Sequence, residues 1–145
     1  MTKARTRDSS IEWLRGDAQD LPFPDASFDC VTIGFSTRNV SDLAAACREW
    51  FRVLRRPGRL VILETGKPQG WLVRLGYYTY LTVIMPVIGV LVCRTLWPFQ
   101  YLRRSIRRFL SPSAFQALLR EAGFQEVMHR PLHGGIADLF VGVKA

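Results

Sequence analysis

Cysteine and histidine are scarce in this chain, and their scarcity removes several classes of protein. The 145 residues include three cysteines and two histidines. Cys30, Cys47 and Cys93 are widely spaced and form no C-x-x-C pair of the kind that indicates a redox couple or a zinc knuckle. His129 and His133 fall in an expected strand and the turn after it, where they point to different places, and no third ligand accompanies them. We therefore expect no metal site, and a reducing cytosol as the natural compartment.

Targeting signals and common catalytic signatures are also missing. The first ten residues are basic but have no apolar stretch behind them, so they do not form a secretory signal, and we expect residues 1–10 to be a flexible tail. The sequence has no internal repeat and no low-complexity tract. It contains no phosphate-binding P-loop, no G-x-S-x-G nucleophile elbow and no H-E-x-x-H zinc motif.

The composition is that of a globular protein with an excess of positive charge. With 48% hydrophobic and 22% charged residues, residues 1–145 fit a single domain. Twenty lysines and arginines against twelve acids give a net charge of +8, which favours anionic partners such as nucleic acid or a membrane face. The basic clusters match no helix-turn-helix, RNP or zinc-finger signature. We expect no nucleic-acid binding, and most of the arginines to lie on solvated helix faces and turns.

The first half of the chain has the rhythm of a parallel βαβ unit. Residues 11–14 are a short apolar run typical of a buried strand that enters a loop. Residues 28–35 are rich in β-branched and aromatic side chains, as in a strand covered on both faces. A helix is expected from Ser41 or Asp42 to about residue 54, followed by a buried strand at 59–64. Short loops between these elements predict a doubly wound sheet.

The second half ends in a different pattern. Ser111 and Pro112 are an N-cap and a first-turn proline, and Gly123 is placed to end that helix. Residues 125–131 and 136–143 read as two strands of a hairpin. The sequence therefore predicts a parallel sheet finished by an antiparallel hairpin.

The middle of the chain, residues 66–110, does not fit this alternation. Residues 75–93 are nineteen positions without a charge, which makes the segment a transmembrane candidate by length. Pro86 and Gly89 are expected to interrupt it, and no second span is apparent. We expect a helical insertion that caps the site and contacts a bilayer or an apolar substrate tail, with a true span as the alternative.

Polar residues after the expected strands are the candidates for chemistry. Ligands of such sheets bind beyond the carboxyl ends of the strands. Asp17 could accept hydrogen bonds from an exocyclic amine or a ribose, although on the residues alone an aspartate that starts an ordinary turn is the favoured explanation. Residues 34–39 should line the same crevice, where Arg38 could stabilise a phenolate or enolate and Asn39 could orient a hydroxyl. The alternative for Arg38 is a surface arginine that closes a loop.

Five segments in this order resemble one family. They are GDAQDLPFPDASFDCVTIGF, TRNVSD, REWFRVLRRPGRLVILE, QYLRRSIRRF and FQALLREAGF. The chain is similar to the ubiquinone and menaquinone biosynthesis C-methyltransferases from about residue 11 to residue 142. The resemblance implies a Rossmann-like class I methyltransferase sheet with S-adenosylmethionine as the cofactor and a polyprenylated quinol precursor as the substrate.

The resemblance also assigns roles to residues. Asp17 and Ala18 match the pair that contacts adenine, and Gly34 matches a position that contacts the cofactor and is often serine. Arg38 and Asn39 match an Arg-Asn pair on the acceptor side, where deprotonation of the ring must be assisted. No metal is implied, and the only candidate groove for a polyprenyl tail is the insertion.

The chain departs from the family before its first expected strand. The family's glycine-rich cofactor loop and its ribose-binding acid have no counterpart here, so the sheet is expected to be incomplete at its N-terminus and cofactor binding to be weak. A complementary N-terminal polypeptide would supply them. The alternative is a non-catalytic remnant or half-enzyme that binds a quinone, a membrane or that polypeptide. We expect a cytoplasmic protein that is peripheral at the inner face of the membrane.

Overall fold

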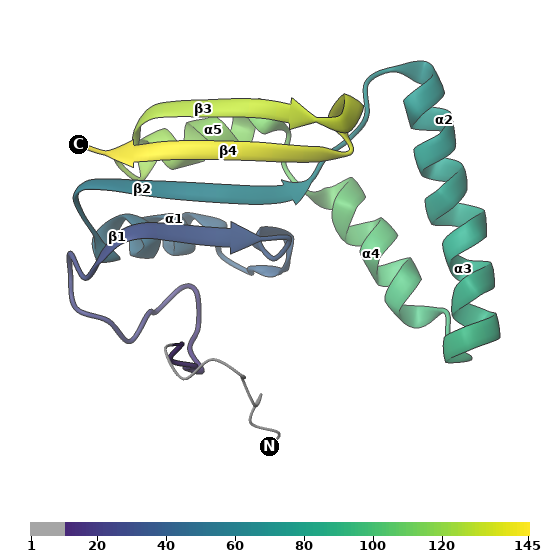
Figure 1. Ribbon diagram of the computed structural model, residues 1–145, viewed down its shortest axis with the longest axis horizontal. Coiled ribbons are helices and arrows are strands. Elements are labelled where there is room, and N and C mark those ends of the chain that lie inside the picture. Colours follow the sequence, from purple (N-terminus) through teal and green to yellow (C-terminus); the bar gives the residue numbers. More distant parts are fainter. Residues whose placement is uncertain (1–10) are drawn as a thin grey trace.

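A four-stranded sheet forms the centre of the computed structural model, which describes residues 11–145 (Figure 1). Its strands are β1 (Phe28–Gly34), β2 (Leu54–Thr65), β3 (Gln125–Leu132) and β4 (Ala137–Lys144), in the order β1-β2-β4-β3. β1 and β2 are parallel, and β4 runs antiparallel to β2 and β3. The parallel unit and the closing hairpin are therefore confirmed. The tail predicted at residues 1–10 lies outside the described residues.

Two helices cover one face of this sheet. They are α1 (Leu43–Val53) and α5 (Pro112–Glu121), which lie on the same side of the strands (Figure 1). The side chain of Asp42 accepts a hydrogen bond from the Ala45 N–H at 2.9 Å and so begins α1, and Ser111 does the same for the Ala114 N–H. Gly123 follows α5 with a φ of +107°, which an L side chain rarely adopts. Both predicted helices are confirmed.

The hydrophobic core lies between these helices and the sheet. Alternate residues of β2 and β4 point into it, so that Leu60, Ile62 and Phe140 are buried. Phe115 of α5 packs edge-on against Phe109 and Phe140, with ring centroids 5.5 and 4.8 Å apart. The strands, α1 and α5 together are called the sheet unit below.

The opposite face of the sheet is only partly covered. Along β2 and β4 the alternate residues Val61, Leu63, Leu139 and Val141 are half-buried, whereas their neighbours on the helix side are buried. β1 pairs with β2 alone, so within residues 11–145 its other edge carries no strand. The expectation that residues 28–35 are covered on both faces is therefore wrong for the described chain: β1 is an edge strand with alternate exposed positions.

The strand expected at residues 11–14 does not form. Ile11, Trp13 and Leu14 are each more than half exposed, and the neighbourhood contains only an isolated bridge between Asp17 and Asp20. A strand needs a partner for its backbone groups, and the described residues provide none at this place.

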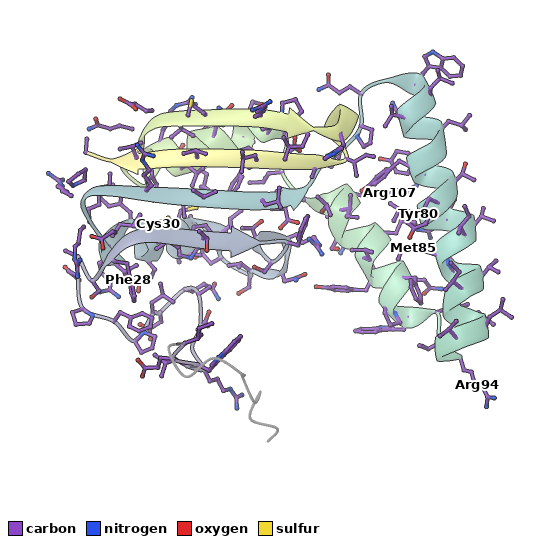
Figure 2. All side chains as sticks on the ribbon, in the orientation of Figure 1. Phe28, Cys30, Tyr80, Met85, Arg94 and Arg107 are labelled. Carbon is purple, nitrogen blue, oxygen red and sulfur yellow. The ribbon has the colours of Figure 1, made fainter. Side chains whose placement is uncertain are left out.

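The insertion is a pair of helices that stands at one end of the sheet. α2 (Trp71–Thr79), η2 (Tyr80–Ile84), α3 (Met85–Ile88) and η3 (Gly89–Cys93) follow one another, with η2 and η3 as π-helical turns. Arg94, in the left-handed conformation, ends this run, and α4 (Trp97–Arg108) returns towards the sheet. In Figure 2, Arg94 lies at the end of the run that is far from the sheet. Residues 71–108 are called the cap below.

Pro86 and Gly89 do not break this helical run, contrary to expectation. Pro86 lies at the start of α3 directly after a π-helical turn, where a missing N–H is tolerated. Gly89 permits close packing, because a Cβ atom there would lie 2.0 Å from the Phe99 ring of α4. The helix Trp71–Val92 is long and apolar enough to cross a membrane by length and composition alone, and only 11% of its most apolar window is buried.

Candidate functional site

A buried carboxylate organises the end of the sheet where β1 and β2 finish. Glu64 is fully buried near the end of β2, and it forms an ion pair with Arg38 from the short helix η1 (Thr37–Asn39) after β1. The Thr37 hydroxyl donates to Glu64 at 2.6 Å, and the Thr65 N–H donates to it at 2.8 Å. Because β1 and β2 are parallel, their carboxyl ends meet at this edge, as the sequence predicted.

The protonation state of Glu64 follows from these contacts. Burial alone would raise the pKa of Glu64, but the hydrogen bonds from Thr37 and Thr65 and the charge of Arg38 outweigh burial and hold it below its ordinary value. Glu64 is therefore a carboxylate at neutral pH. It orients Arg38, whose Nε is buried and has no partner among residues 11–145.

The cap is tied to this edge by two tyrosines. The hydroxyl of Tyr101 in α4 donates to the Asn39 Oδ1 at 2.8 Å. The hydroxyl of Tyr77 in α2 reaches the Gly66 carbonyl at 3.5 Å. Asn39 thus faces the cap, whereas Arg38 turns back towards the sheet.

Asp17 is positioned by a glutamine and not by a preceding strand. Gln19 donates to the Asp17 carboxylate through its backbone N–H at 3.0 Å and through its side-chain amide at 3.2 Å. These bonds lower the pKa of Asp17, the backbone bond most. The Gln19 Oε1 accepts hydrogen bonds from Ser41 at 3.0 Å and from the Asp42 N–H at 2.8 Å, which fastens the loop to the start of α1.

The structure brings together some of the predicted site residues and separates others. Asp17, Ala18 and Asn39 line one open cavity of about 670 Å³. Arg38 lines a neighbouring cavity of about 430 Å³ beside Tyr101 and α4. Gly34 ends β1, and a Cβ atom at Gly34 would meet nothing within 4 Å, so its backbone is open to a ligand.

These features fit the adenosine end of S-adenosylmethionine. Asp17 is an exposed carboxylate with hydrogen-bonding capacity left, in a cavity that is large enough for a nucleoside. The open space above Gly34 would admit a close backbone contact. The roles of Asp17, Ala18, Gly34, Arg38 and Asn39 stay predictions.

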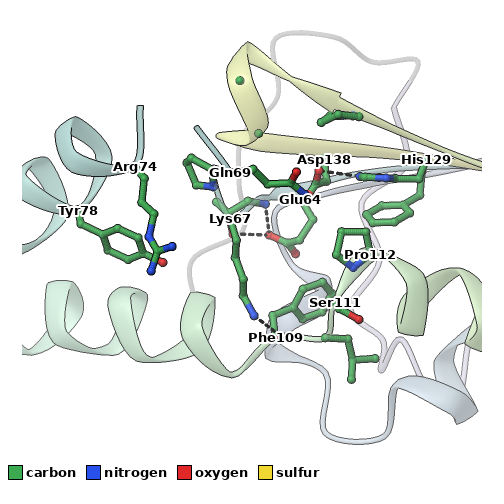
Figure 3. Close-up of a pocket in the computed structure, with 17 residues that line it drawn as sticks. Glu64, Lys67, Gln69, Arg74, Tyr78, Phe109, Ser111, Pro112, His129 and Asp138 are labelled. Carbon is green, nitrogen blue, oxygen red and sulfur yellow. Dashed lines mark hydrogen bonds and ion pairs between the residues drawn. The ribbon is translucent and has the colours of Figure 1, made fainter. Parts of the chain in front are cut away.

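A further cavity, of about 660 Å³, lies between the sheet, the hairpin turn and the cap (Figure 3). Glu64 and Lys67 form one part of its wall, and Arg74 and Tyr78 of α2 form another. His129 of β3 lies on the far wall, where its Nε2 is 2.7 Å from Asp138 Oδ1 of β4. Within residues 11–145, no group of three or more histidines, cysteines and acids is placed to hold a metal ion.

Sequence reasoning missed Glu64, Thr37, Gln19 and the His129–Asp138 pair. The sequence predicts Glu64 as the last residue of a strand, and only its position next to a polar loop indicates a role. His129 was weighed only as a metal ligand, because its partner is nine residues away across a hairpin.

Comparison with known proteins gives consistent matches. Residues 1–144 match the ubiE/COQ5 methyltransferase family. The chain is 40% identical over 136 residues to a demethylmenaquinone methyltransferase of Bacillus licheniformis, which covers 94% of this chain and 59% of the relative. It is 39% identical over 135 residues to a ubiquinone/menaquinone biosynthesis C-methyltransferase UbiE of Cronobacter sakazakii, covering 93% of this chain and 54% of the relative.

Solved structures agree on the fold. A SAM-dependent methyltransferase of Thermotoga maritima superposes with a TM-score of 0.60 at 22% identity, covering 91% of this chain and 63% of that one. One from Aquifex aeolicus gives a TM-score of 0.62 at 14% identity, covering 94% and 56%. The fold is thus the Rossmann-like α/β fold of class I methyltransferases, and the chain spans little more than half the length of the curated relatives it matches.

Proposed function

Because the chain belongs to the ubiE/COQ5 methyltransferase family, we propose that it takes part in the transfer of a methyl group from S-adenosylmethionine to a ring carbon of a polyprenylated quinol. The observation that carries this proposal is Arg38, held by the buried Glu64 at the carboxyl ends of β1 and β2, next to the cavity that Asp17 lines. The chain spans 59% of its Bacillus relative, so we propose that the activity also uses the part of the relative's length that this chain does not match, whether that part is covalently continuous or separate.

Asp17, Ala18 and Gly34 would hold the adenosine end of the cofactor. The Asp17 carboxylate would accept hydrogen bonds from it, and the open backbone at Gly34 would let it approach closely. When bound, S-adenosylmethionine supplies an electrophilic methyl group on a sulfonium.

Arg38 and Asn39 would act on the acceptor. A quinol ring carbon becomes nucleophilic when the neighbouring hydroxyl loses its proton, and Arg38 would stabilise the oxyanion that develops. Glu64 holds the guanidinium in place before the reaction, so little reorganisation is needed. Asn39, whose amide is fixed by Tyr101, would orient the acceptor oxygen.

The remaining cofactor contacts would come from a segment that joins the free edge of β1. That edge leaves backbone groups unpaired within residues 11–145, and the adjoining sheet face presents the half-buried Val61, Leu63, Leu139 and Val141. We propose that a complementary N-terminal polypeptide, covalently continuous or separate, adds its strand here and covers this face.

The cap would contact the membrane at the cytoplasmic face, where a polyprenylated substrate resides. It exposes a series of large apolar side chains: Trp71, Leu72, Leu75, Val83, Val87, Ile88, Val90, Leu91, Val92 and Trp97. It also carries six arginines and no acid, which favours an anionic surface. These features support a peripheral attachment in which the cap guides the polyprenyl tail to the site.

The test is to restore the missing part and measure each step. The chain is co-expressed with the segment of the Bacillus relative that it does not match, and cofactor binding is followed by calorimetry. Methyl transfer is followed with radiolabelled cofactor and a short-chain demethylmenaquinol. We expect feeble binding by the chain alone, and restored binding and transfer by the complex.

Two variants of the complex separate the assigned roles. Arg38→Ala should lower kcat with little change in cofactor affinity, and Asp17→Ala should weaken the cofactor and leave kcat largely unchanged. Cofactor binding without transfer to any quinol would favour the non-catalytic remnant, which the family match does not favour. If Arg38→Ala weakened cofactor binding and left turnover intact, the assignment would be wrong.

A further inference from the structure

The cavity between η1 and α4 has a basic wall that the function proposed above uses only in part. Its volume is about 430 Å³, and Arg38 of η1 lines it together with Arg104 and Arg108 of α4. The charge of Arg38 is balanced by the buried Glu64. Within residues 11–145, neither Arg104 nor Arg108 takes part in an ion pair or a cation–π contact. These two arginines therefore carry the unbalanced positive charge of this cavity.

The geometry of α4 places its polar side chains in one row along the cavity. Tyr101, Arg104 and Arg108 are separated by three and four residues, so they share one side of the helix. The hydroxyl of Tyr101 donates to the Asn39 Oδ1 at 2.8 Å, which holds this side of α4 against η1. The two arginines thus line the cavity from a helix that is fixed at the start of the row.

The stability of α4 does not explain why two arginines stand here. Like charges four residues apart on a helix repel each other and destabilise it. A basic side chain near the end of a helix commonly bonds to the last carbonyls, but in α4 this role belongs to a residue outside the helix. Lys67 donates to the carbonyls of Arg107 and Phe109 at 3.2 and 2.7 Å. Arg104 and Arg108 are therefore available to an anion in the cavity.

The same cavity has apolar side chains that restrict which anion fits it. Val40, Leu43, Phe109 and Leu110 also line it. A bare inorganic anion gains nothing from these side chains, whereas an aromatic ring buries apolar surface against them. The volume lies in the range of pockets that hold small organic ligands. An aromatic ring with a negatively charged oxygen would use both kinds of wall.

This cavity adjoins the one that Asp17 lines. Val40 and Ser41 contribute to the walls of both cavities. A ligand beside Arg104 and a second ligand beside Asp17 would therefore lie next to each other, with only a short segment after η1 between them. Transfer of a group between two bound molecules requires such a placement.

We propose that this cavity binds an aromatic ring in its ionised, phenolate form, and that Arg104 and Arg108 bind the charged oxygen beside Arg38. The identification of this ring with the quinol acceptor rests on the proposed function. The hydroxyl proton passes to solvent water, and the ring carbon next to the ionised oxygen becomes nucleophilic. Opposite charges nearby should favour the ionised form over the neutral form by about tenfold, at the low end for such contacts because the two arginines are exposed.

The test uses the full chain and 4-nitrophenol, which titrates near neutral pH and absorbs visible light strongly only when it is ionised. The measurement is made at the single pH where half of the free probe is ionised, so the protonation of the protein itself does not vary. Saturation with protein should raise the ionised share of the probe to about nine-tenths. The methyl ether 4-nitroanisole, which cannot ionise, should bind more weakly, as measured by its displacement of 4-nitrophenol.

Three variants that each remove one positive charge locate the effect. Arg104→Gln and Arg108→Gln act in the cavity, and each should abolish most of the rise in the ionised share. Arg94→Gln is the matched control, because Arg94 lies at the end of the cap that is far from the sheet (Figure 2), and it should keep the rise. All three positions are exposed, so thermal melts should show little change in stability.

Three outcomes would overturn the inference. An unchanged ionised share would show that the cavity does not favour a phenolate. An equal loss in Arg104→Gln and Arg94→Gln would show that only the net charge of the cap matters. Displacement of 4-nitrophenol by an equimolar amount of inorganic phosphate would show a site for a plain anion.

These measurements need neither the cofactor nor methyl transfer, so they stand apart from the proposed reaction. In the complex that restores methyl transfer, Arg104→Gln should lower kcat/KM for the quinol about tenfold and leave cofactor affinity unchanged. A complex that methylates a quinol equally well with Arg104→Gln would refute only the role of the cavity arginines. Ionisation of the probe by the chain, without methyl transfer in the complex, would refute only the proposed reaction.

Discussion

The sheet unit and the cap use apolar side chains in opposite ways. In the sheet unit, Phe115, Phe140 and Leu119 are buried to 1% exposure or less, and they hold the helices on the strands. In the cap, Leu81 and Ile106 are buried, whereas most other large apolar side chains are exposed. Apolar side chains therefore form the core of the sheet unit, whereas in the cap they form an exposed surface.

The two regions also differ in charge. The sheet unit combines basic residues with acidic partners, as in the ion pairs of Arg38 with Glu64 and Arg52 with Glu49. The cap has arginines alone. A region with exposed apolar groups and unneutralised positive charge is suited to an external partner. The stability of the chain and the membrane attachment proposed for the cap should therefore respond to different substitutions.

The largest expected effect is on folding. Phe115→Ala removes a fully buried ring from contact with Phe109 and Phe140 and should lower the free energy of unfolding by about 3–5 kcal/mol. Leu91→Ala in the cap removes a side chain that is 76% exposed and should change it by less than about 0.5 kcal/mol. Urea unfolding followed by circular dichroism compares the two. Equal losses would show that the cap belongs to the same core.

The next effect concerns the buried ion pair. Glu64→Gln leaves the Arg38 guanidinium without its counter-charge and should cost about 3 kcal/mol of unfolding free energy. Adding Arg38→Gln should cost less than the sum of the single variants, since the two groups interact directly. As a control, Tyr101→Phe removes a half-exposed hydrogen bond between the cap and Asn39 and should cost about 1 kcal/mol or less. Strict additivity at Arg38 and Glu64 would contradict the coupling.

Much of the fold could be predicted because its signals are local. Ser111 with Pro112, and Asp42 before an amphipathic run, begin their helices in the structure as their sequences indicate. The hairpin was likewise visible from two β-rich runs around a glycine turn. Residues 11–14 were predicted wrongly, because periodicity reports the preference of a segment and not whether a neighbouring strand is available to pair with it.

The candidate site could be predicted only in part. Arg38 and Asn39 were identified from their position after a strand and from the resemblance, but nothing local indicated that they would face different cavities. The contacts that determine this come from Glu64 and Tyr101, which are 26 and 62 residues away from their partners. Pro86 and Gly89 carry a similar lesson, since helix breakers are tolerated where π-helical turns and the packing of Phe99 accommodate them.

A third prediction uses pH to separate the regions further. The hydrogen bond from Arg52 lowers the pKa of Glu49 to about 2, against an ordinary value of 4.5. Because the folded-state pKa is depressed, its stabilisation is present above about pH 4.5 and is lost as the pH falls towards 2. We expect a loss on the order of 2 kcal/mol across this window, measured by thermal melts at several pH values.

The matched variants for this effect are both substitutions of glutamate by glutamine. Glu49→Gln should remove the part of the pH dependence that Glu49 contributes, whereas the part contributed by the buried Glu64, whose pKa is also lowered, should remain. Glu121→Gln, at an exposed position of α5 that forms no ion pair within residues 11–145, should leave it unchanged. Since the cap contains no aspartate or glutamate, the helix content of the cap should not change with the protonation of Glu49. An unchanged acid transition in Glu49→Gln would place the titrating group elsewhere in the sheet unit.

The smallest expected effect of a single residue is its contribution to the binding of the cap to a membrane, which can be measured by co-sedimentation with liposomes. Arginine near an anionic surface contributes about 1 kcal/mol per residue, and salt screens this attraction. Binding should therefore rise with the fraction of anionic lipid and fall at high salt.

Val87→Ser combined with Leu91→Ser, at side chains that are 52% and 76% exposed, should weaken binding without lowering stability. Met128→Ser removes an apolar side chain of β3 in the sheet unit whose exposed fraction, 61%, lies between those two values, and it should leave binding unchanged. A loss in this control would mean that the sheet unit itself contacts the lipid. Extraction separates the remaining alternatives. Release by salt or carbonate is expected of a cap that lies on the membrane surface, whereas retention after both treatments would identify Trp71–Val92 as an integral span. Failure to sediment at low salt would leave the cap without a membrane role.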